Sequence, residues 1–324
     1  MQTFLPVSDF AESARLLDSP RLGKQRVETL QVLRALELPD YGWASHPAVQ
    51  MWRGRTPALV AYGLVMVQEW RERGFADSTS PLIAEFAPQV VGVPQVELSR
   101  AGLLPSWVGS EELHRSHRSN LLSKDPAFYR PVLTARFGPE PDDLPYVWPG
   151  PDDIAPPPSP AGARVWVVRP RTHEELGACL AAGVVGLGTR SGIDVDATGR
   201  GPAELSALVK ELSGRRPGKD LRQLSTFLDE VRPGDPVGLP VEQGAGLLLG
   251  EVVGTYAFDG REPLPHRRAV RWDRVVPRSA ARYPATLQDP RALFAVVVDP
   301  AVVDPWSSTD VRPGAVTAPS ARPS

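Results

Sequence analysis

The sequence predicts a multidomain protein, with an all-α N-terminal domain followed by an α+β C-terminal domain. Apolar residues recur at helical spacing in the first half, whereas short β-rich segments separated by glycine and proline fill much of the second half. Between them lies the proline-rich segment PGPDDIAPPPSPAG, which has few side chains that could build a core. The 324 residues are enough for two such cores.

These observations predict four parts of the chain. We expect a helical domain over residues 1–148, a linker over 149–162 and a second domain over 163–300. A tail over 301–324, rich in Pro, Ser and Ala, is expected to be disordered.

Three helices are expected in the N-terminal half. The first covers about residues 20–37, with Pro20 in its first turn. The second runs over about 57–73 and ends at Gly74. The third begins near Ser110, a favourable N-cap.

The C-terminal half is expected to alternate strands with helices, and its later strands are expected to close into a small β-barrel. The predicted helices cover residues 174–182, 205–212 and 221–231; the predicted strands cover 164–168, 184–187, 236–239, 247–256, 269–272 and 294–298.

Composition and charge restrict the possible functions. The formal net charge is −2, so any nucleic-acid binding must use local basic clusters. The one cysteine, Cys179, excludes an intrachain disulfide and fits a reducing compartment. The start of the sequence does not look like a signal peptide, and the apolar run over 59–67 is too short to span a bilayer. We therefore expect a cytoplasmic location with no membrane association.

One polar helix face combines groups that suit chemistry on nucleic acid. Arg21, Lys24, Gln25 and Glu28 fall within an arc of roughly 100° on a helix. Cations meet phosphate oxygens, Gln can bond a base edge, and Glu can transfer a proton. The alternative is a solvated helix face with a Lys24–Glu28 ion pair.

A second cluster comprises His114, His117 and Arg118, which also share one helical face. It suits phosphate binding or proton transfer, because histidine titrates near neutrality. No carboxylate or cysteine stands at a spacing that completes a metal site, so no metal is expected. The alternative role of these side chains is capping and packing.

A third candidate is the segment HPAVQMWR, residues 46–53, which places His46 and Arg53 around a short helix. We expect both to bind nucleic acid, and we expect Trp52 to belong to the core rather than to stack on a base.

Taken in order, several N-terminal segments resemble bacterial members of the pyrimidine-dimer DNA glycosylase family, of the endonuclease V type. The resemblance covers about residues 1–148 and rests on MQTFLPVSDF, LDSPRLGKQRVETLQVLRAL, HPAVQMW, EWRERGF, LHRSHRSNLLSKDPAFY and DDLPYVWP. It implies a compact helical fold, base excision and strand cleavage at the abasic site. In the phage enzyme an N-terminal α-amine attacks the sugar and forms an imine, assisted by a glutamate.

Transferred to this chain, the resemblance makes Glu28 the nearest match to the glutamate and assigns phosphate contacts to Arg21, Lys24 and Arg26. Three possibilities stay open for the nucleophile: the α-amine of Met1, Lys24, or none. Gln2 is bulky and disfavours removal of Met1. An α-amine ordinarily has a pKa of about 8 and a lysine amine about 10.4, which favours Met1.

The C-terminal half resembles a PUA-like domain of the EVE-related kind, found beside Mrr-type restriction nucleases. The resemblance covers about residues 163–298 and rests on RVWVVRP, GVVGLG, LRQLSTFLDEVRPGDPVGLP, LLLGEVVGTYAFDG and HRRAVRWDRVVPRSA. It implies a reader of modified bases with an aromatic pocket, for which the candidates are Trp166, Tyr256, Phe258 and Trp272. Core packing is the alternative for Trp166 and Trp272.

The function predicted from the sequence is therefore a DNA glycosylase and abasic-site lyase, active in DNA repair on damaged or modified bases and carrying a C-terminal reader domain. DNA is the expected partner and no cofactor is expected. The alternative is a non-catalytic nucleic-acid-binding protein, a sensor of modified bases that acts against foreign DNA.

Overall fold

A computed structural model describes residues 2–38, 41–150, 162–188, 193–213, 218–241, 244–260, 263–281 and 283–303. The chain divides into two compact units, Met1–Ala161 with Pro277–Val297 and Gly162–Val276 with Val298–Ser324. The expected domain over 163–300 is thus interrupted, because Pro277–Val297 groups with the N-terminal helices. Most of the predicted linker and of the predicted tail lies outside the described residues, although Ala301–Val303 belong to a short helix.

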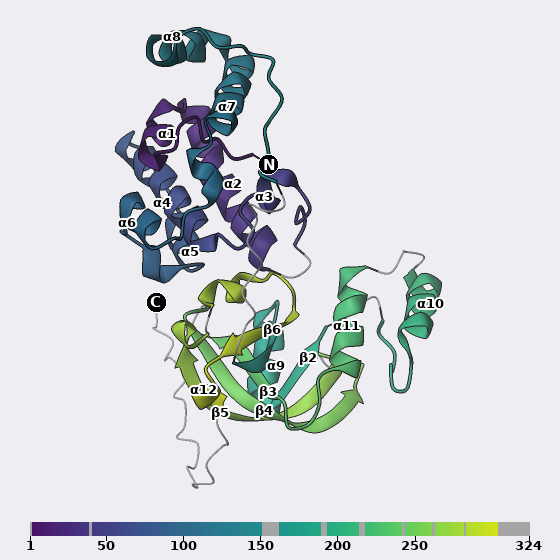
Figure 1. The fold of residues 1–324 in the computed structure, drawn as a ribbon. Helices are drawn as coiled ribbons and strands as arrows, with labels where there is room; N and C mark the ends of the chain where they lie inside the picture. Colours follow the sequence, from purple (N-terminus) through teal and green to yellow (C-terminus); the bar gives the residue numbers. More distant parts are fainter. Residues whose placement is uncertain are drawn as a thin grey trace, which may run out of the picture. The chain divides into compact units, whose positions relative to one another are not determined.

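The N-terminal part is helical, as predicted (Figure 1). Its helices are α1 (Phe10–Leu16), α2 (Ser19–Glu37), α3 (Pro47–Gln50), α4 (Thr56–Glu72), α5 (Ser80–Ala84), α6 (Gln95–Arg100), α7 (Glu111–Lys124) and α8 (Pro126–Phe137), with 3-10 turns η1 (Pro88–Val90) and η2 (Ser106–Gly109). The three predicted helices correspond to α2, α4 and α7. Asp18 caps α2 by accepting from the Arg21 amide, and Ser110 caps α7 by accepting from the Leu113 amide.

The core of this unit forms where α2 packs against α4. At their contact, Gly63 leaves room for the Thr29 side chain. Trp52 is fully buried and packs edge-on against Phe10 and Trp107, so its expected core role is confirmed. This packing fixes the face of α2 that carries Glu28.

Residues Pro277–Val297 complete the N-terminal unit. Ala285 is buried in the helical core, and the Arg278 guanidinium pairs with Glu85 at 2.6 Å. Gln288 accepts from the Arg34 guanidinium and donates to the Leu82 carbonyl. A segment far away in the sequence therefore takes part in this fold, which local sequence patterns do not reveal.

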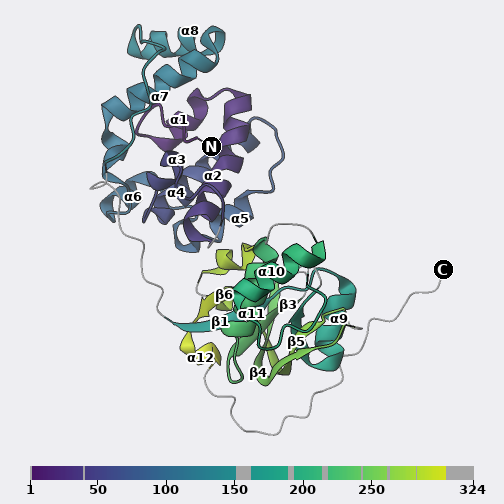
Figure 2. The same cartoon turned by 90° about the vertical axis from the view of Figure 1, so that its right-hand side faces the viewer.

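The C-terminal half has the predicted α+β content. Its elements are β1 (Ala163–Val168), α9 (His173–Ala182), β2 (Val184–Leu187), α10 (Pro202–Ser213), α11 (Lys219–Asp229), β3 (Pro236–Val241), β4 (Gly246–Phe258), β5 (His266–Pro277), η6 (Arg278–Ala280), η7 (Pro284–Gln288), β6 (Leu293–Val298) and α12 (Pro300–Val303). In the described residues the strands form a mixed sheet in the order β2-β5-β4-β3-β1-β6. The strands β1, β3, β4, β5 and β6 are labelled in Figure 2.

The sheet combines a parallel pair, β1 with β3, and antiparallel pairs, β3 with β4 and β2 with β5. Within the described strands, no pairing of β2 with β6 closes the sheet into the expected barrel. Across the same described ranges, no helix combines the length and the apolar character that crossing a membrane would require.

Candidate active site

The N-terminal segment Gln2–Pro6 is held by buried side chains of α2, α4 and α7. On α2, the Gln25 side-chain oxygen accepts from the Phe4 amide at 3.0 Å, and its nitrogen donates to the Gln2 carbonyl at 3.1 Å. The Gln25 side chain is buried, with 1% of the residue exposed. Gln25 therefore holds the chain's own backbone, and the expected contact with a base edge is wrong for this arrangement.

Two histidines of α7 hold the next residue, Leu5. His117 Nδ1 accepts from the Leu5 amide at 2.9 Å, so this ring is neutral. His114 faces two carbonyl oxygens, those of Leu5 at 2.8 Å and Val108 at 2.7 Å. Burial, followed by the charge of His114, lowers the pKa of His117 to about 3.

Arg118 completes this scaffold at Pro6. Its guanidinium donates to the Pro6 carbonyl at 2.9 Å and pairs with Glu140 at 2.8 Å and with Glu111. His114, His117 and Arg118 are 3%, 0% and 1% exposed. Their predicted phosphate contacts are therefore corrected: the protein itself satisfies these groups, and DNA cannot reach them here.

Two aromatic side chains also form hydrogen bonds with the N-terminal segment. The Tyr62 hydroxyl donates to the Phe4 carbonyl at 2.7 Å, and the Trp52 indole donates to the Thr3 hydroxyl at 3.1 Å. Each residue from Gln2 to Pro6 thus bonds to a buried side chain of the helical core. The start of the chain has a fixed path across α2.

This path leads to the Glu28 carboxylate. Glu28 is 6% exposed, and its Oε2 accepts from the Gln2 amide at 3.1 Å. Met1 lies outside the described residues. The exposed Lys24 lies on the same helix face, with Nζ 3.7 Å from Glu28 Oε1. The structure therefore places Lys24 and Glu28, two of the three expected catalytic residues, side by side, and the role of each stays a prediction.

Three further titratable side chains are within electrostatic reach of Glu28. Burial lowers the pKa of His46, while the Glu28 charge raises it. Burial raises the pKa of Tyr62 and that of Tyr146, and the Glu28 charge adds to both. The Tyr146 hydroxyl is buried, with no hydrogen-bond partner among the described residues. The sequence analysis missed Tyr146, although it lies in the quoted segment DDLPYVWP.

The expected phosphate-binding cations fall into two groups. Arg21 pairs with Asp18 at 2.6 Å and donates to the Lys124 carbonyl, and Arg26 pairs with the buried Asp77 at 2.5 Å. These bonds tie both guanidiniums to the fold. Lys24, at 66% exposure of its side chain, and the exposed Arg53 are accessible for contacts with phosphate.

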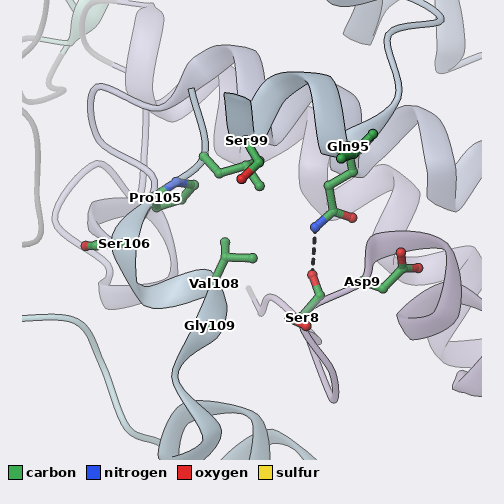
Figure 3. A pocket seen from close by; sticks show the side chains of 10 residues that line it. Ser8, Asp9, Gln95, Ser99, Pro105, Ser106, Val108 and Gly109 are labelled. Atoms are coloured by element: carbon green, nitrogen blue, oxygen red, sulfur yellow. Dashed lines mark hydrogen bonds between the residues drawn. The ribbon is translucent and has the colours of Figure 1, made fainter. Parts of the chain in front are cut away.

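An open cleft of about 590 Å³ lies where the N-terminal segment enters α1 (Figure 3). Gln95 forms one wall, donating to the Ser8 carbonyl at 2.8 Å and accepting from the Phe10 amide at 2.7 Å. Asp9 is the charged residue in the lining, and it caps α1. Because no cation is among the described lining residues, the cleft does not suit a phosphate.

The four aromatic residues expected to form a base pocket in the C-terminal half do not form one cluster. Tyr256 and Phe258 both contact His266, and the Tyr256 hydroxyl lies 2.9 Å from His266 Nδ1. Trp166 instead donates to Asp235 at 3.2 Å, and Trp272 donates to the Cys179 carbonyl at 3.0 Å. Tyr256 and Phe258 therefore share a neighbour, whereas the two indoles are used in separate structural contacts, and a base pocket at these residues stays a prediction.

Comparison with known proteins finds a similarity for each half of the chain. Residues 1–81 match the family model described as pyrimidine dimer DNA glycosylase. This range contains the N-terminal segment, Lys24, Glu28 and Arg53, so the described part of the candidate site up to residue 81 lies in the region similar to this family. Residues 168–282 match a domain of unknown function, DUF8426, which names no activity. No curated protein matches the chain.

Proposed function

We propose that the N-terminal unit is a DNA glycosylase and abasic-site lyase that acts on damaged or modified bases in the cytoplasm. The observation that carries the proposal is the 3.1 Å hydrogen bond from the Gln2 amide to Glu28, which ties the start of the chain to a buried acid. The match of residues 1–81 to pyrimidine dimer DNA glycosylase supports damaged DNA as the substrate class.

In the proposed reaction, a neutral amine attacks C1′ of the target nucleotide. The new C–N bond replaces the N-glycosidic bond, and the base leaves as its anion and takes a proton from water. The Glu28 carboxylate accepts the proton that the amine loses and supplies one as the sugar ring opens to an imine. Loss of a proton from C2′ then expels the 3′ phosphate, and water releases the amine from the opened sugar.

Two amines are candidates for the nucleophile. Met1 is bonded to Gln2, whose amide donates to Glu28, and Lys24 Nζ lies 3.7 Å from the same carboxylate. At neutral pH an ordinary α-amine is neutral more often than a lysine amine, which favours Met1. Lys24→Ala separates the two, because it removes one candidate and leaves the other.

The test is to incubate the full chain with duplexes that carry a pyrimidine dimer, an abasic site or a modified base, in the presence of borohydride. Borohydride reduces an imine to a stable amine, so a covalent protein–DNA adduct is expected, and peptide mapping should place it on Met1 or Lys24. Glu28→Gln should abolish turnover and leave DNA binding within about twofold, since it keeps the shape and removes the charge. Glu37→Gln, at an exposed position of the same helix, is the matched control.

The second candidate function is that of a non-catalytic nucleic-acid-binding protein. The bulky Gln2 favours it, because a bulky second residue disfavours the removal of Met1 that would expose a new α-amine. The absence of an adduct with every substrate would replace the enzymatic proposal with this one. Intact-mass measurement of the N-terminus shows whether Met1 is retained, and so which α-amine is available.

For the C-terminal half we propose a role as a reader of modified bases, supported by the contacts of Tyr256 and Phe258 with His266. Phe258→Ala in the full chain should weaken any preference for a modified duplex over the plain one. Val253→Ala is the control, because Val253 is 50% exposed on the same strand. Equal binding of modified and plain duplexes by the parent would refute the reader role.

A further inference from the structure

Trp43 differs from the other tryptophans of the N-terminal unit. It is 64% exposed, the highest value among the large apolar side chains that the structure describes. Its backbone has φ 74°, the left-handed conformation that bulky residues rarely adopt. Exposure and backbone strain both oppose stability, so the fold gains little from an indole at this position.

The turn that carries Trp43 is nevertheless well anchored. The His46 amide donates to the Trp43 carbonyl at 2.9 Å, and the Gln50 side chain donates to the Ala44 carbonyl. The indole meets the His46 ring edge-on, with 5.9 Å between the ring centroids. The backbone is therefore fixed while the indole faces water, an arrangement suited to presenting the ring to a partner.

The position of the turn relates Trp43 to the candidate active site. His46 caps α3 by accepting from the Ala48 amide at 3.1 Å, and it is close enough to Glu28 for the carboxylate charge to affect its pKa. The exposed Arg53 follows the same short helix. An exposed aromatic ring thus accompanies a cation and a buried acid in one region of the N-terminal unit.

We propose that Trp43 stacks on a nucleobase of the DNA bound at the Glu28 site, next to the target nucleotide. An indole offers a flat apolar face, and each base has a π-face, so such stacking does not depend on sequence. A base lifted from the duplex loses its stacking partners, and an exposed indole replaces one of them. The choice of DNA as the partner rests on the proposed function.

The test measures the affinity of the full chain for a duplex that carries a tetrahydrofuran analogue of an abasic site. Trp43→Asn removes the ring and keeps a residue that tolerates positive φ, so the turn should persist. It should weaken binding about fivefold to a hundredfold. Trp43→Phe keeps a ring and should stay within about threefold to fivefold of the parent. Phe128→Ala is the matched control and should bind as the parent does, because Phe128 is a 41% exposed aromatic of α8.

Two further readouts separate stacking from a structural role. The thermal midpoint of Trp43→Asn should equal or exceed that of the parent, because the strain is relieved. Adding the duplex should quench part of the tryptophan emission of the parent, and Trp43→Phe should lose that part while still binding.

Binding by Trp43→Asn equal to that of the parent would overturn the stacking proposal, whatever the chemistry of the site. Loss of affinity in Trp43→Asn together with failure of the parent to form any borohydride adduct would uphold stacking and reject the lyase. If the parent binds no DNA, both proposals fall.

Discussion

The Nδ1 atom of His117 accepts a hydrogen bond of 2.9 Å from the amide of Leu5, across 112 residues of sequence. The bond requires a neutral ring, and burial with the neighbouring charge of His114 lowers the pKa of His117 to about 3 from an ordinary value of 6.5. The folded state therefore resists a protonation that the unfolded chain accepts below about pH 6.5.

This difference predicts acid sensitivity of the N-terminal unit. The contribution of the neutral His117 ring to the free energy of unfolding is complete above about pH 6.5. It is lost progressively as the pH falls towards 3, by at most about 1.4 kcal/mol per pH unit. In His117→Asn the amide oxygen can accept from Leu5 and does not titrate. Denaturant unfolding between pH 7.5 and 4 should give a smaller slope for this variant, and an unchanged slope would contradict the assignment.

Gln25 is predicted to control the position of the N-terminal segment. Gln25→Leu keeps a similar volume but leaves the Phe4 amide and the Gln2 carbonyl without their partner, at a cost of about 1–3 kcal/mol in unfolding free energy. Borohydride trapping should fall by more than about tenfold, because the segment leaves Glu28. Gln68→Ala, at an exposed position of α4, should change stability by less than about 0.5 kcal/mol. Normal trapping in Gln25→Leu would refute this role.

The contact between α2 and α4 gives a third prediction. A Cβ on Gly63 would lie 2.6 Å from Thr29 Cγ2. Thr29 is the residue that follows Glu28 in the sequence. Gly63→Ala should therefore destabilise the N-terminal unit by about 1–3 kcal/mol, despite the better helix propensity of alanine. Gly177→Ala in α9 meets nothing within 4 Å and should stabilise by about 0.5–1 kcal/mol. Calorimetry of both variants tests whether the stability falls in Gly63→Ala and rises in Gly177→Ala.

Local patterns allowed the main elements to be predicted from the sequence. Periodicity and caps lie within one stretch of chain, so α2, α4 and the strand β2 were placed within a few residues of their observed ends, and α7 at its observed start. The short helix α1 was not predicted. The helix α8 was not predicted either, and it contains Pro131, a residue that disfavours the interior of a helix.

The roles of single side chains depended on contacts that no local pattern contains. The polar face of α2 was recognised, but its Gln25 turned out to be covered by the N-terminal segment. The same segment covers His114 and His117, which come more than a hundred residues later. Trp43 gave no signal, because a lone tryptophan outside a periodic segment is ordinarily expected in the core.

Arg53 is predicted to contribute to DNA affinity without sequence preference. It is exposed, has no partner among the described side chains and lies in the matched domain. Arg53→Ala should weaken binding to all duplexes alike, and the slope of log K against log salt concentration should become shallower by about 0.9. Arg100→Ala is the control, because Arg100 is 72% exposed and pairs with Glu97. Salt titrations with equal slopes for parent and Arg53→Ala would exclude the contact.

The hydroxyl of Tyr146 gives the last prediction. It is buried without a partner among the described residues, and burial and the charge of Glu28 raise its pKa, so it remains a protonated donor. Tyr146→Phe removes this unsatisfied group and should raise the unfolding free energy by about 1 kcal/mol. If the hydroxyl meets the reacting nucleotide, single-turnover excision should fall about tenfold in the same variant.

Tyr129→Phe provides the matched comparison, because the Tyr129 hydroxyl accepts from the Asp18 amide at 3.1 Å. That variant should lose about 1–3 kcal/mol of stability and keep its excision rate, the reverse of the pattern at Tyr146. The unfolding free energy and the single-turnover excision rate, measured on both variants, test whether the two hydroxyls have these different roles. A loss of stability in Tyr146→Phe with an unchanged rate would assign its hydroxyl to the scaffold and remove it from the candidate active site.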